Sequence, residues 1–126
     1  MTGIHQILFS SFAAGGGVDT TVHTITSDQT FDRTGATKIN WLLVGGGGSG
    51  AGGEAGQNNG GGGGAGGFRR GQNTSFTSVA GLHITIGNGP SGGANDTDGT
   101  KGGDSILAYA TGGGGSGTVI ATSEGG

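Results

Sequence analysis

The stretch from residue 45 to residue 67 most constrains what this chain can fold into, because 15 of its 23 residues are glycine. Each glycine inside an α-helix costs about 0.8–1 kcal/mol relative to alanine, so no helix is expected here. Gly45, Gly47 and Gly50 match the G-x-G-x-x-G spacing of a dinucleotide-binding turn, but that turn has to open a helix. The match therefore reflects glycine density and does not indicate a nucleotide site.

The same stretch contains a period of three. Glycine occupies four positions at this spacing, Gly47, Gly50, Gly53 and Gly56. Three residues per turn is the period of the left-handed polyproline II helix, which has no internal hydrogen bonds. Because glycine has no Cβ atom, two such helices can approach closely and bond to each other. The sequence predicts antiparallel polyglycine II helices at 45–56 and 60–67, turning at Gln57-Asn58-Asn59. A disordered glycine loop is the alternative.

Strand-like segments alternate with the glycine blocks. β-branched residues and alternating apolar residues predict strands at 22–26, 38–44, 73–79, 82–86, 105–110 and 118–122. Segment 38–44 is apolar on both faces, which predicts a strand buried on both. Residues 87–103 have the composition of a polar loop. We therefore expect an all-β fold, a small antiparallel β-sandwich with glycine-rich, polyglycine II-like segments and no substantial α-helix.

The first 17 residues form a distinct piece. Four apolar residues fall on one face of a short helix, although Leu8-Phe9 could equally lie in a strand: Ile4, Ile7, Leu8 and Phe12. Gly15-Gly16-Gly17 follows as a hinge. The predicted division is an N-terminal anchoring segment at 1–17 and a glycine-rich β domain at 18–126. The four apolar residues would anchor the chain on a partner; packing onto their own domain is the alternative.

Composition and charge exclude several classes of protein. The chain has 36 glycines in 126 residues and only 10% charged residues, whereas disordered chains are usually highly charged. A net charge of −3 gives no electrostatic attraction for nucleic acid or for an anionic membrane. No apolar run approaches the roughly 20 residues that span a bilayer, so no membrane insertion is expected. The absence of cysteine excludes disulfides and thiolate metal sites.

No constellation of residues indicates catalysis. His5, His23 and His83 are dispersed without ligand spacing. Aligning Asp98-Gly99 with an EF-hand loop places Ala94 and Ser105 where oxygen ligands are required, so that match fails. A looser calcium site around residues 95–104 stays open. We expect no enzyme activity, no cofactor and no metal site.

Loop tips are the expected recognition surface, because loops carry recognition in most proteins. The candidate residues are Gln57, Asn58, Asn59, Phe68, Arg69, Arg70, Asn95, Asp96 and Asp98. Arg69-Arg70 is the one basic spot, for which a solvated turn is the alternative interpretation.

The order of these segments resembles the glycine-rich domain of bacteriophage tail fibres and related virion proteins. The resemblance is carried by a threonine-rich entry strand and then TKINWLLVGGGGSGAGG, GGGGGAGGF, LHITIGNG and ILAYATGGGGSG, over residues 20–120. It implies a compact β-structure with glycine-rich segments, used for structural assembly or host-surface recognition, without catalysis.

We therefore expect a bacteriophage virion structural protein of the tail-fibre or receptor-binding type. Its partners would be other virion proteins and a host surface glycan or protein, and its location the virion. A small core without disulfides makes an isolated monomer marginal, so a homo-oligomer is expected. The alternatives are a capsid decoration protein, of the cement or head-fibre kind, and an ice-binding protein built of polyglycine helices.

Overall fold

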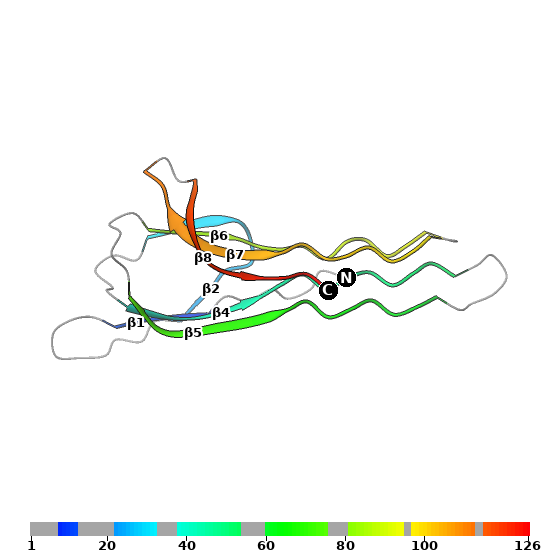
Figure 1. Ribbon diagram of the computed structural model, residues 1–126, viewed down its shortest axis with the longest axis horizontal. Coiled ribbons are helices and arrows are strands. Elements are labelled where there is room, and N and C mark those ends of the chain that lie inside the picture. The colour runs from blue at the N-terminus through cyan, green and yellow to red at the C-terminus, as the bar shows by residue number, and fades with distance from the viewer. Residues whose placement is uncertain are drawn as a thin grey trace.

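The computed structural model describes residues 8–12, 22–32, 38–53, 60–75, 81–94, 97–112 and 115–126. The molecule is elongated, with a β-sandwich at one end and a bundle of extended glycine-rich segments at the other (Figure 1). No helix occurs in these ranges. The predicted all-β class is confirmed.

The strands of the described part form two antiparallel sheets of four strands each. Sheet A has the order β2 (His23–Thr24), β1 (Leu8–Phe12), β4 (Lys38–Val44) and β5 (Phe68–Ser75). Sheet B has the order β3 (Gln29–Phe31), β6 (Leu82–Thr85), β7 (Ser105–Ala110) and β8 (Ser116–Ser123). Register shifts interrupt the β4–β5 and β7–β8 pairs.

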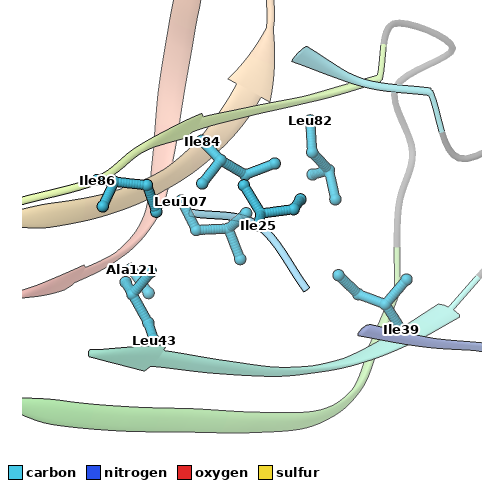
Figure 2. Close-up of a cluster of buried hydrophobic side chains, with 8 residues drawn as sticks. All are labelled: Ile25, Ile39, Leu43, Leu82, Ile84, Ile86, Leu107 and Ala121. Atoms are coloured by element: carbon cyan, nitrogen blue, oxygen red, sulfur yellow. The ribbon is translucent and has the colours of Figure 1, made fainter. Parts of the chain in front are cut away.

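Apolar side chains from both sheets fill the space between them (Figure 2). The buried cluster consists of Ile25, Ile39, Leu43, Leu82, Ile84, Ile86, Leu107 and Ala121. Burying one such aliphatic side chain stabilises the fold by about 1.5–3 kcal/mol. The prediction that β4 is buried on both faces is wrong, because Leu42 and Val44 are only half-buried.

The structure decides two of the sequence-based expectations about strands. The strand alternative for Leu8-Phe9 is confirmed, because Leu8–Phe12 form a strand that lies between β2 and β4, with Leu8 opposite Leu42. Residues 8–12 are therefore paired with the domain predicted at 18–126. The strand predicted at 73–79 begins earlier, at Phe68, and is described as far as Ser75.

Four extended segments build what we call the glycine bundle: 45–53, 60–67, 87–94 and 97–104 (Figure 1). Gly45 N–H donates to Gly67 O at 2.8 Å, and three residues later Gly48 N–H donates to Gly64 O at 2.9 Å. This register makes segments 45–53 and 60–67 antiparallel. The predicted pairing of two glycine segments with a period of three is thus confirmed over these residues, whereas Gln57, Asn58 and Asn59 lie outside the described part.

The prediction of a polar loop at 87–103 is wrong, because this region supplies two further segments of the bundle. Three donors at a spacing of three, the N–H groups of Gly46, Ser49 and Gly52, bond to the carbonyls of Gly103, Thr100 and Thr97, each at 2.9 Å. A Cβ atom on Gly99 would overlap the Ser49 carbonyl, and one on Gly102 would overlap the Gly46 carbonyl. These close approaches require glycine at both positions.

Candidate recognition surface

Two connections of the bundle leave it at the end far from the sandwich, which we call the distal end (Figure 1). One is 54–59, between segments 45–53 and 60–67, and the other is 95–96. The flanking segments are bonded to each other, because Gly52 N–H donates to Thr97 O at 2.9 Å and Gly93 N–H donates to Gly50 O at 3.2 Å. The bundle therefore brings the starting points of both connections together.

Thr97 closes the reversal of the chain between segments 87–94 and 97–104. Its backbone N–H and its side-chain hydroxyl both donate to the Ala94 carbonyl, at 3.2 Å and 2.7 Å. Threonine favours such turns because its hydroxyl can replace a backbone donor. Sequence reasoning placed Thr97 in a loop tip but did not assign it this turn-closing role, which a threonine three residues after the start of a polar turn could have indicated.

The structure places only part of the predicted recognition residues at this end. Asp98 follows Thr97 and is exposed. The predicted residues Gln57, Asn58, Asn59, Asn95 and Asp96 belong to the two connections and lie outside the described part of the chain. For these residues the recognition role stays a prediction.

The expectation that Phe68, Arg69 and Arg70 form a loop tip is wrong. They begin β5, the edge strand of sheet A, and Phe68 lies opposite Val44 and Arg70 opposite Leu42. This position is the junction of bundle and sandwich, away from the distal end (Figure 1). Since directly opposed residues of an antiparallel pair share a face, Phe68 extends the half-buried outer face of β4. Its side chain is 63% exposed.

Two acidic side chains, Asp104 and Asp28, accept hydrogen bonds from backbone N–H groups. Asp104 Oδ1 accepts the Gly125 N–H at 2.9 Å and lies 3.7 Å from Lys101 Nζ. That ion pair is solvent-exposed and so adds little stability. Asp28 Oδ1 accepts the Ile86 N–H at 2.7 Å, at the end of β6. Within the described ranges, no three histidine or acidic side chains gather as metal ligands would.

The two described histidines belong to different sheets. The His23 ring in β2 meets the Phe31 ring edge-on, with centroids 4.7 Å apart. His83 in β6 lies with Nδ1 3.5 Å from Thr30 Oγ1. These contacts are within the sandwich, remote from the distal end, and they give the imidazoles a packing role.

None of the described segments of the chain forms a helix that is both long and apolar enough to cross a membrane.

Comparison with known proteins gives a match to one family. No curated protein and no solved structure matches the chain. The profile of the glycine-rich domain matches residues 20–126. This range includes the whole glycine bundle and every strand of both sheets except β1. The chain therefore belongs to the glycine-rich domain family.

Proposed function

We propose that this protein is a bacteriophage virion structural protein of the tail-fibre, receptor-binding type, which attaches to other virion proteins and to the host surface. The observation that carries the proposal is that the segments from which the connections 54–59 and 95–96 start are bonded to each other at the distal end of the bundle. An elongated body that brings together the starting points of two connections suits contact with a surface.

The construction of the bundle supports this role. Segment 45–53 is bonded to 60–67, to 97–104 and to 87–94, through backbone groups in each case. A bundle bonded in several directions fixes the described residues from which the two connections start. Such preorganisation reduces the ordering cost of binding.

The chemistry of the two connections indicates a polar ligand. Residues 57–59 are glutamine and asparagines, and Asn95 and Asp96 form the other connection. Side-chain amides offer both donors and acceptors, whereas a carboxylate offers acceptors only. A hydroxyl-rich host glycan or a polar protein loop presents matching groups.

The test is competition for adsorption. The purified protein should block attachment of the phage to its host cells, and the variant with Asn58→Ala, Asn59→Ala and Asn95→Ala should block it about tenfold less well, a loss of roughly 1.4 kcal/mol. The matched control is Thr118→Ala, which changes an exposed residue of β8. Equal blocking by all three proteins, or by none, would refute the receptor-binding role. Immunogold label on the capsid and not on the tail would favour the decoration role.

An ice-binding protein is the second candidate, because the bundle presents a run of exposed small residues at 60–65. Small side chains on a flat face are what that function needs. Among the described segments of the bundle, 60–67 alone presents such a run, and much of the chain lies in the sandwich. We expect no thermal hysteresis; a measurable freezing-point depression at micromolar protein would reverse the order of the two candidates.

A further inference from the structure

A groove of about 310 Å³ runs along the glycine bundle next to the last residues of the sequence. It is lined by Gly48, Ser49, Gly64, Gly99, Thr100, Lys101 and Gly126. These residues come from segments 45–53, 60–67 and 97–104, with Gly126 at one end. The groove is therefore built almost wholly of backbone and small side chains.

The groove and residues 124–126 lie along one track on the bundle. Residues 124–126 occupy the part of this track nearest the sandwich, and they show how the track binds a chain. Gly67 N–H donates to Glu124 O at 2.6 Å. Gly126 N–H donates to Gly46 O at 2.9 Å, and Gly102 N–H donates to Gly126 O at 2.7 Å. This short segment thus bonds to all three walls at once.

The next three bonding groups along the walls are open. They are the N–H of Gly64, the carbonyl of Ser49 and the N–H of Gly99, each three residues from a group that binds 124–126. None of the three has a hydrogen-bond partner among the residues that the structure describes. The local geometry also repeats, because Gly99 lies against the Ser49 carbonyl as Gly102 lies against the Gly46 carbonyl.

The first part of the track also defines which side chains it admits. Glu124 is exposed, so its position accepts a polar side chain. A Cβ atom on Gly125 would overlap the Gly102 carbonyl, and one on Gly126 would overlap the Ala65 carbonyl. The pattern of an occupant is therefore X-Gly-Gly, with a polar residue at X.

We propose that the groove binds a glycine-rich segment of a partner protein, in polyglycine II conformation and with the pattern X-Gly-Gly. The partner segment continues the ladder of residues 124–126, accepting from Gly64 and Gly99 and donating to Ser49. Residues 124–126 themselves are the precedent for this occupant, since they already fill the adjoining turn of the track. The proposal does not depend on the virion role.

A tethered segment gives the sharpest test, because it replaces a weak bimolecular association by an intramolecular one. Extending the chain after Gly126 with Asn-Gly-Gly should slow amide hydrogen exchange at Gly64 and Gly99 about tenfold or more relative to the unextended protein. Extending it with Asn-Ala-Ala should leave both rates unchanged, because its methyl groups meet carbonyls. No slowing with Asn-Gly-Gly overturns the proposal.

A free peptide tests binding in trans. In an NMR titration, acetyl-Asn-Gly-Gly-Asn-Gly-Gly-amide should shift the Gly64, Gly99 and Thr100 amides, and acetyl-Asn-Ala-Ala-Asn-Ala-Ala-amide should not. Gly64→Ala places a methyl 3.3 Å from Gly126 and should weaken binding about fivefold or more. Gly62→Ala faces open space and should bind as wild type. Absence of these shifts, or equal binding by both variants, overturns the proposal. If the protein alone self-associates and thereby protects Gly64 and Gly99, the occupant is a second copy and the partner assignment is wrong.

Discussion

The indole of Trp41 covers the α-carbon of Gly71 on the neighbouring strand. Its Nε1–H donates to Thr74 Oγ1 at 2.9 Å, which fixes the ring across β5. A Cβ atom on Gly71 would overlap the indole ring. A large aromatic side chain on β4 thus packs where its partner strand has no side chain, a known way to stabilise glycine in a sheet.

Gly71→Val should therefore destabilise the protein by about 1–3 kcal/mol, because the indole has to leave its position. Chemical denaturation followed by Trp41 fluorescence measures the change. Gln72→Val is the matched control, since Gln72 is the exposed neighbour on the same strand. Equal effects of the two substitutions would show that the indole does not depend on Gly71.

Two buried serines lie opposite each other on β7 and β8. Replacing them with alanine is expected to change the stability of the protein in different ways. Ser105 Oγ accepts the Gly87 N–H at 2.9 Å and donates to Val44 O at 2.7 Å, so it joins the sandwich to the bundle. Ser123 Oγ is buried and has no hydrogen-bond partner among the residues that the structure describes. Ser105→Ala should cost about 1–3 kcal/mol, because it leaves two backbone groups unsatisfied. Ser123→Ala should be neutral or stabilising. Thermal unfolding of both variants measures the two changes in stability. A larger loss of stability for Ser123→Ala than for Ser105→Ala would contradict the hydrogen bonds assigned to Ser105.

The bundle should distinguish glycines by position. Gly50→Val should cost about 1–3 kcal/mol or more, because its Cβ would overlap the Gly61 carbonyl. Ser49→Val should be milder, about 1 kcal/mol, since it loses only the bond from Thr100 N–H to Ser49 Oγ at 2.8 Å. Gly62→Ala, in open space, should be neutral or stabilise by about 0.4–1 kcal/mol through the unfolded state. Urea denaturation measures all three, and equal tolerance would mean that the segment is a loop.

The anchoring prediction needs variants that spare β1. Removing residues 1–14 would remove an inner strand of sheet A along with the proposed anchor. Ile4→Ser with Ile7→Ser changes only residues before that strand, and should reduce incorporation into virions about tenfold while the unfolding temperature stays within a few degrees. Cosedimentation with assembled particles is the measurement. Unchanged incorporation would exclude the anchor, and a folding defect would assign these residues to the domain.

Sequence patterns located the strands that contain an apolar run. β4 at Lys38–Val44 and β7 at Ser105–Ala110 match their predicted ranges. The start of β5 was not predictable, because Phe68–Ser75 has no apolar alternation and is held by pairing with β4 and by Trp41. A strand specified by its neighbour leaves little pattern of its own.

Segments 87–94 and 97–104 carry a signal that glycine density conceals. Gly87, Pro90 and Gly93 share the register of Gly99 and Gly102, a spacing of three that suits polyproline II, and proline fixes the φ angle of that conformation. The sequence alone identified the polar residue types of the two connections at the distal end. It did not predict that the segments from which they start lie together, because that depends on which segments bond to each other.

The glycine bundle also determines how the protein responds to temperature. Its segments are joined by backbone hydrogen bonds, so unfolding them exposes the polar N–H and C=O groups of the backbone. Exposure of polar surface lowers the heat capacity, whereas exposure of apolar surface raises it. We expect calorimetry to give a heat-capacity change of unfolding below the usual value of about 12–15 cal/mol/K per residue. A small heat-capacity change flattens the stability curve, so the bundle should lose little stability on cooling, where a side-chain core weakens.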